Sequence, residues 1–220
     1  MNQILLWQDR AVVQLPKSGS NTLYRAWSGT AGSSIPYDLA PDFKTTAQLS
    51  VPVSLTIPLR EPVDRYWAGL RQDYLDSHSD DLTAYLRAHE QQLAVTAAGE
   101  YRADSDLHTL EDITYRLLRI VELTRTCWSR VVLLPIDSLT DWLNKEWHIH
   151  TSERHNSHGS ALIEAVTAYR QHRPDVDDRI RALPRIRAEY HLWDLVGQTF
   201  TVSESVRTLI QTRHSAGILH

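Results

Sequence analysis

A polar loop between two regular elements carries the residues with the clearest chemistry. An apolar run at 11–15 is followed by Pro16-Lys17-Ser18-Gly19-Ser20-Asn21-Thr22 and then by a helical pattern. Where a strand ends in such a loop and continues into a helix, the loop amides and the helix dipole favour an anion. Lys17 adds a positive charge, Gly19 allows close approach of the backbone, and the hydroxyls at 18, 20 and 22 add donors. We therefore predict an anion site at 17–22.

A second segment repeats this design. The apolar run at 51–59 predicts a strand, in which Pro52 and Pro58 favour an edge position or pairing confined to the middle. The run Arg60-Glu61-Pro62-Val63-Asp64-Arg65-Tyr66 follows, and its Pro suits the first turn of a helix. The apolar stripe of the following residues predicts a helix over 62–74. A second charged loop is therefore expected at a strand end.

Further elements are expected along the chain. A small leading strand is predicted at 4–7, a short strand at 34–37 and a third convincing strand at 130–136. Helical patterns fall at 81–93, 110–121, 138–147, 160–172 and 175–183. Helices are also expected to begin at a capping box on Ser138, at Tyr190 and after a cap at Ser203. Strands that alternate with helices indicate an α/β fold, with a central parallel sheet flanked by helices and ligands at the carboxyl ends of its strands.

Together the two charged segments resemble the signatures of the sulfotransferases that use 3′-phosphoadenosine 5′-phosphosulfate (PAPS). Residues 16–22 are similar to the 5′-phosphosulfate loop, P-K-[ST]-G-[ST]-[ST], and residues 60–66 to the 3′-phosphate segment of the carbohydrate branch, R-[DEN]-P-x-[DE]-R-[FY]. The resemblance implies a P-loop-like sulfotransferase fold. It also implies that Lys17 is catalytic and that Arg60 binds the 3′-phosphate. The cofactor-binding residues implied in the first loop are Lys17, Ser18, Gly19, Ser20, Asn21 and Thr22. Arg65 is expected to be structural.

The chain departs from this family pattern at identifiable positions. Ala68 stands where the family usually has a Ser that donates to the same phosphate. Residues 106–108, Asp-Leu-His, resemble the start of a D-x-H-x-x-x-Q region, but Asp112 stands at the Gln position. The general base is either His108 or Asp38, because residues 29–50 contain no His and no Glu.

A late polar loop resembles the family segment that covers the adenosine and the 3′-phosphate. Arg154 and Asn156 in this loop are candidate cofactor ligands. The same loop holds His148, His150, His155 and His158, whose spacing matches no closed zinc pattern, so we predict no metal.

Composition limits the remaining possibilities. The chain has 220 residues and a net charge of −4, which disfavours nucleic acid as a partner. Its one cysteine, Cys127, precludes an intramolecular disulfide, and no stretch reaches the ~20 apolar residues of a membrane span. We expect a single domain over 1–220 in a soluble, cytoplasmic protein of bacterial or viral origin, with no membrane partner.

The resemblance implies transfer of a sulfuryl group from PAPS to a hydroxyl acceptor, a carbohydrate or a small metabolite, leaving 3′-phosphoadenosine 5′-phosphate (PAP). One alternative is a P-loop kinase or nucleotide hydrolase, since the run at 133–137 could be a strand that ends in a magnesium-binding Asp. Against it, the only Lys of the first loop precedes its Gly, unlike G-x-x-x-x-G-K-[ST]. The other alternative is a degenerate sulfotransferase fold that binds a ligand without turnover.

Overall fold

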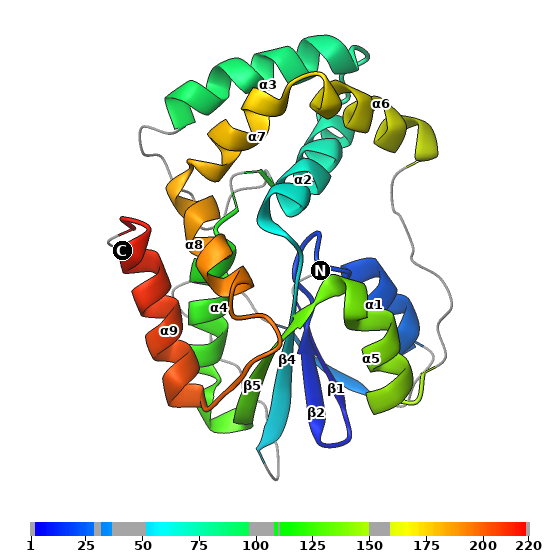
Figure 1. Ribbon diagram of the computed structural model, residues 1–220. Helices are drawn as coiled ribbons and strands as arrows, with labels where there is room; N and C mark the ends of the chain where they lie inside the picture. The colour runs from blue at the N-terminus through cyan, green and yellow to red at the C-terminus, as the bar shows by residue number, and fades with distance from the viewer. Residues whose placement is uncertain are drawn as a thin grey trace.

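Six strands form one sheet in the order β3-β1-β2-β4-β5-β6 in the computed structural model, which describes residues 3–28, 32–36, 52–96, 108–109, 111–149 and 159–218. The strands are β1 Gln3–Trp7, β2 Arg10–Val13, β3 Ser33–Pro36, β4 Val53–Leu59, β5 Trp128–Pro135 and β6 Thr199–Phe200. The helices are α1 Ser20–Ser28, α2 Pro62–Asp76, α3 Leu82–Thr96, α4 Ile113–Leu123, α5 Leu139–Glu146, α6 Ser160–Gln171, α7 Pro174–Arg181, α8 Pro184–Trp193 and α9 Val202–Ser215. Short 3₁₀ turns precede β5 (η1, Arg125–Cys127) and α5 (η2, Ile136–Ser138). The predicted α/β class is confirmed (Figure 1).

The sheet is parallel only at its centre. β2 pairs with β4, and β4 with β5, in parallel, whereas β1, β3 and β6 join antiparallel. β1 and β2 are antiparallel because their connection is a two-residue turn, too short for a parallel crossover. The edge position expected for the second strand is wrong, since β4 lies between β2 and β5. The pairing of β4 with β2 covers only Ser54 to Thr56 and stops before Pro58, whereas the pairing with β5 runs from Val53 to Leu59.

Two expected helix starts are wrong, and the helix expected at Ser138 begins there but without the predicted cap. No helix begins at Tyr190, because residues 190–193 form the end of α8. α8 begins at Pro184, and a proline fits the first position of a helix. The last helix is capped by Thr201 in a reciprocal capping box with Glu204, not by Ser203. Ser138 makes no capping hydrogen bond, because the turn η2 runs directly into α5 and leaves Ser138 in a helical conformation.

The two faces of the sheet are covered by different helices, as alternation along the strands requires. Leu5 and Val12 pack with α1 and α5 on one face. Their neighbours Ile4, Ala11 and Val13 pack with α4, α8 and α9 on the other. Figure 1 shows α1 and α5 on one side of the sheet and α4, α8 and α9 on the opposite side.

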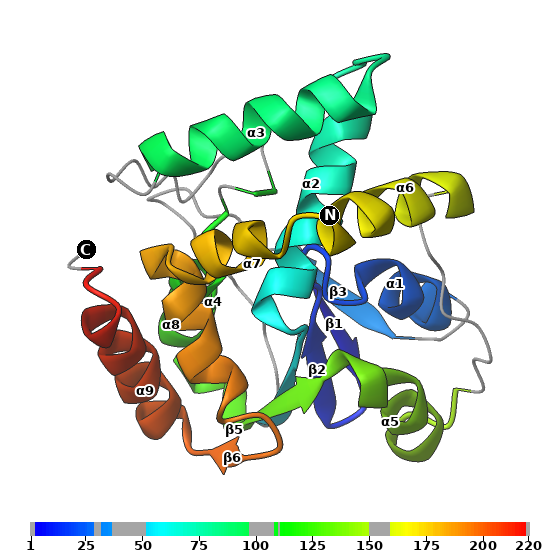
Figure 2. The ribbon, with the colours of Figure 1, turned by 45° about the horizontal axis from the view of Figure 1, so that its top comes forward.

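A third apolar cluster lies beyond the carboxyl ends of the parallel strands. It joins α2, α3, α6, α7 and α8, with Tyr66, Trp67 and Leu70 of α2 buried at its centre. Figure 2 shows these helices grouped above the sheet, with α2 running from the end of β4 into the group. α2 therefore connects the sheet edge with this helical layer. Among the described residues, no helix combines the length and apolar character that a bilayer span requires.

Candidate functional site

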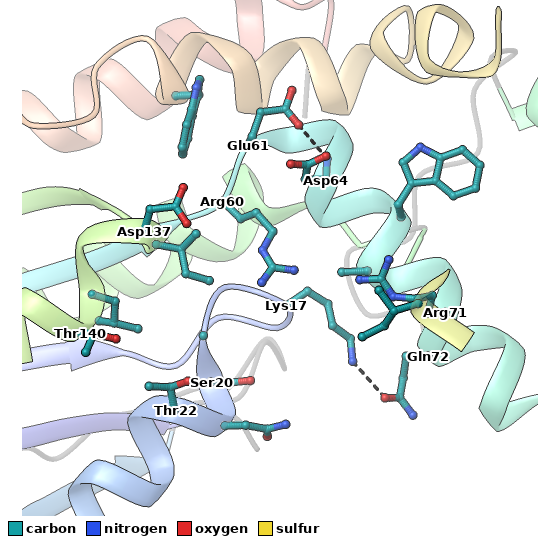
Figure 3. A pocket seen from close by; sticks show the side chains of 18 of the residues that line it. Lys17, Ser20, Thr22, Arg60, Glu61, Asp64, Arg71, Gln72, Asp137 and Thr140 are labelled. Atoms are coloured by element: carbon teal, nitrogen blue, oxygen red, sulfur yellow. Dashed lines mark hydrogen bonds between the residues drawn. The ribbon is translucent and has the colours of Figure 1, made fainter. Parts of the chain in front are cut away.

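A cavity of about 530 Å³ opens at the carboxyl ends of the three parallel strands. Its walls come from the segments that directly follow β2, β4 and β5 and from α2, α6 and α8 (Figure 3). The lining residues predicted to bind an anion are Lys17, Gly19, Ser20, Asn21, Thr22 and Arg60. The structure thus brings together two segments that lie about 40 residues apart in the chain.

The loop after β2 is shaped by two residues with positive φ angles, Lys17 at 58° and Gly19 at 83°. The first intrahelical bond of α1 runs from the amide of Leu23 to the carbonyl of Gly19, 2.9 Å. Amides of the first helical turn have no carbonyl partner within their own helix, so they are suited to an anion. Ser18 does not line this cavity; its side chain is buried, and its hydroxyl has no hydrogen-bond partner among the described residues.

Lys17 reaches across the cavity to α2. Its Nζ donates to Oε1 of Gln72 at 3.1 Å, and Nε2 of Gln72 donates to Asp76 at 2.8 Å. Burial lowers the pKa of the Lys17 ammonium, and the carboxylates of Asp73 and Asp76 oppose that shift. Lys17 is therefore a partly desolvated cation at the cavity wall, whose interaction with an anion is weakly screened.

The segment after β4 is held by the start of α2. Glu61 caps the helix by accepting a bond from the amide of Asp64 at 2.7 Å, and its other oxygen accepts from the Tyr190 hydroxyl. Arg65 is buried and donates through Nε to Glu189 of α8 at 2.7 Å, which confirms its predicted structural role. Arg60 is thus presented to the cavity by a helix start fixed to α8.

Positive charge gathers on the α2 side of the cavity. Arg71 and Arg170 line the cavity together with Arg60 and Lys17. Arg170 is neutralised by Asp64 and Asp177, at 2.6 and 2.8 Å. Burial lowers the pKa of Arg71 most, and the neighbouring charge of Arg60 lowers it further. This wall is suited to an anionic ligand.

His108 and Thr109 form a turn that a buried carboxylate of α2 binds. Asp73 accepts from the amide of His108 at 2.8 Å, and from the amide and hydroxyl of Thr109 at 3.0 and 2.7 Å. Gly69 makes room for this contact, since a Cβ there would lie 3.1 Å from the Cβ of His108. Burial and the charge of Lys17 lower the pKa of the imidazole. His108 does not line the cavity, but it lies close enough to Lys17 for their charges to interact.

Several predicted residues lie outside the described part of the chain. They are Asp38, Arg154 and Asn156, with the histidines at 150, 155 and 158. Asp112 is structural: it caps α4 by accepting from the amide of Tyr115 at 2.9 Å, and it pairs with Arg213 at 2.6 Å. In the described residues, no group of three or more metal-ligating side chains is assembled.

Sequence reasoning missed two polar residues of α2 that line the cavity, Arg71 and Gln72. The sequence does contain a signal for them: Arg71 and Gln72 follow Ala68 by one helical turn, and residues at that spacing lie on the same helix face. Asp137 also lines the cavity, close to the end of β5. Trp67 is buried, and its ring nitrogen donates to Asp177 at 2.8 Å. Trp142 is only partly buried.

Comparison with known proteins adds no assignment. Neither protein-family models, nor curated proteins, nor solved structures give a match to this chain.

Proposed function

We propose that this chain is a PAPS-dependent sulfotransferase with a P-loop-like fold that acts on a hydroxyl of a carbohydrate or a small metabolite. The observation that supports it best is the shared cavity, which the loop at 17–22 and Arg60 border from two different strand ends. PAPS carries a phosphate at the 3′ position of its ribose and a phosphosulfate at the 5′ position. The cations Lys17, Arg60 and Arg71 on the walls of the cavity and a volume of about 530 Å³ fit such a ligand.

The residues of the first loop are suited to stabilise a leaving group. When bound, PAPS supplies the sulfuryl group, and PAP remains as the product. Lys17 and the amides of residues 20–22 neutralise the negative charge that grows on the leaving phosphate oxygen. Preorganised charge of this kind is usually the largest catalytic contribution. The hydrogen bond to Gln72 already orients the Nζ of Lys17 at the cavity wall.

The acceptor hydroxyl must lose its proton as it attacks. We propose His108 as the base, because its lowered pKa favours the unprotonated imidazole and its charge interacts with that of Lys17, although its side chain does not line the cavity. Asp38 stays a prediction, as do the cofactor contacts of Arg154 and Asn156.

One observation favours a second candidate, a P-loop kinase or nucleotide hydrolase. Asp137 and Thr22 line the same cavity, and an Asp with a loop hydroxyl is a magnesium-binding pair in that class. The order of Lys17 and Gly19 in the loop still favours the sulfotransferase. A binding protein without turnover is the third possibility, and it differs from the first only in activity.

Calorimetric titration with PAP and with ATP-Mg distinguishes these functions. We expect micromolar binding of PAP, weakened about 10- to 100-fold in Lys17→Ala and in Arg60→Ala, and no binding of ATP-Mg. Lys145→Ala is the matched control, because Lys145 is an exposed lysine of α5 outside the cavity. Tight ATP-Mg binding without a response to PAP would refute the sulfotransferase. PAP binding without sulfate transfer to any of many hydroxyl acceptors would favour the binding protein.

A further inference from the structure

Arg71 is a cavity-lining cation that the family resemblance does not assign. It follows Ala68 by one turn of α2, and both side chains line the cavity. Residues at this spacing are neighbours on one helix face. The guanidinium of Arg71 therefore projects from the same face as Ala68, where the resemblance leads one to expect a serine hydroxyl.

Two other guanidinium groups lie within electrostatic range of Arg71. The charges of Arg60 and Arg170 both act on it, and Asp64 is the carboxylate that opposes them. Asp64 is itself paired with Arg170 at 2.6 Å. Nε of Arg71 is buried and has no hydrogen-bond partner among the described residues. Within the described part of the chain, Arg71 thus has a donor without a partner and a positive charge that Asp64 offsets only in part.

Figure 3 shows how the positively charged side chains of Lys17, Arg60 and Arg71 are arranged at the cavity. Lys17, Arg60 and Arg71 approach the cavity from the loop after β2, from the end of β4 and from α2. Lys17 belongs to the loop at 17–22, whereas Arg60 and Arg71 belong to the start and the middle of the α2 segment. Cationic donors thus reach the cavity from two segments of the chain, the loop after β2 and the segment of α2, and a guanidinium fork suits phosphate geometry.

We propose that Arg71, together with Arg60, binds the second phosphate of the ligand, the 3′-phosphate, and supplies the contact that Ala68 cannot make. This inference rests on the proposed function, because it takes PAP as the ligand. In this role Arg71 determines specificity, because its guanidinium distinguishes a nucleotide that has a 3′-phosphate from one that lacks this phosphate.

The test compares two ligands that differ only in that phosphate. Calorimetry with PAP and with adenosine 5′-monophosphate is carried out on wild type, Arg71→Ala, Arg71→Gln and the double variant Ala68→Ser/Arg71→Ala. Arg71→Gln retains much of the side-chain volume and therefore separates lost charge from lost packing. Arg125→Ala is the matched control, because Arg125 is exposed and lies at the amino end of β5, opposite the cavity.

We expect both Arg71 variants to bind PAP about 10- to 100-fold more weakly and the monophosphate within about twofold of wild type. Ala68→Ser should restore part of the PAP affinity of Arg71→Ala, and Arg125→Ala should resemble wild type. Equal losses for both ligands, or unchanged PAP binding, would overturn the role of Arg71. If wild type itself does not prefer PAP, the proposed function fails; if wild type prefers PAP and the variants keep that preference, only the present inference fails.

Discussion

Two features of position 19, its backbone angle and the close approach of a neighbouring side chain, favour glycine there. Its φ of 83° lies in the left-handed region, and a Cβ on Gly19 would come within 2.6 Å of Cδ2 of the buried Leu139. The glycine thus lets the anion loop pack directly on α5. Sequence reasoning assigned Gly19 to ligand approach and did not detect this contact with α5.

We expect Gly19→Ala to destabilise the fold by about 2–4 kcal/mol, since it adds left-handed strain to overpacking. Gly197→Ala is the control, because Gly197 has a φ of 88° and nothing within 4 Å of an added Cβ. Urea unfolding of both variants gives their free energies of unfolding and so separates the cost of backbone strain, which both share, from the cost of the contact with Leu139, which only Gly19→Ala makes. Equal losses in the two variants would show that the contact with Leu139 has no effect.

His89 provides a residue-scale prediction about pH. Burial lowers its pKa to about 4, opposed by Asp73, and its Nε2 lies 2.6 Å from the Tyr66 hydroxyl. The unfolded chain therefore binds a proton below a pH of about 6.5, whereas the folded chain binds it only near 4. Stability is complete above about 6.5 and falls by up to about 3 kcal/mol as the pH drops toward 4.

Urea unfolding at pH 7.5 and 4.5 measures this loss. His89→Gln, which cannot titrate, should lose less stability between the two values than wild type. His191→Gln, at an exposed position of α8, should retain the wild-type pH dependence. A wild-type pH dependence in His89→Gln would contradict the assignment.

At the scale of the element, α2 gives both a wall of the cavity and the anchor of the turn at 108–109. Asp73 is almost fully buried and accepts three hydrogen bonds from that turn. An amide in its place offers a single acceptor oxygen and no charge. The position of His108 therefore depends on one carboxylate of α2.

We expect Asp73→Asn to cost about 2–4 kcal/mol of stability, because buried donors lose a charged acceptor. If the proposed function holds, its kcat should fall more than its affinity for PAP. Asp76→Asn is the control on the same helix, since Asp76 accepts from Gln72 and not from the turn. Equal stability in the two variants would refute the anchoring role. The readouts are thermal melting, calorimetry and the rate of sulfate transfer.

At the scale of the whole molecule, α8 joins the helical layer to the sheet. Ile186 of α8 belongs to the cluster of the helical layer, whereas Leu192 packs with the sheet. The buried pair of Arg65 and Glu189 links α8 to α2 between these two clusters. Burial raises the pKa of Glu189 despite its partner, so loss of Arg65 would leave a strongly disfavoured carboxylate.

We expect Arg65→Ala to lower stability by about 3–5 kcal/mol, and the double variant Arg65→Ala/Glu189→Ala to lose less than the sum of the two single variants. Asp178→Ala should change stability little, because it breaks an exposed pair with Arg181. Denaturant unfolding measures all four variants. Additive losses would show that the two side chains do not act as a pair.

Local signals in the sequence predicted most elements, because apolar periodicity, prolines and loop composition act over a few residues. The central strands, α1, α2 and the two charged loops were found in this way, and the loops do border one cavity. Contacts between distant segments could not be predicted. Asp73 and His108 are 35 residues apart, and Arg65 and Glu189 are 124 apart. No local pattern marks such a pair. The antiparallel pairing of the edge strands β3 and β6 likewise depends on contacts with segments far away in the sequence.

The short outer strands affect how copies of this protein meet in concentrated solution. At one end of the sheet β6 has only two residues, and at the other end β3 has four, including Pro36, which has no amide hydrogen. Open strand edges are templates on which another chain can add a strand. In the described part of the chain, neither end offers a long run of such groups. Folded copies are therefore expected to resist stacking edge to edge into extended aggregates.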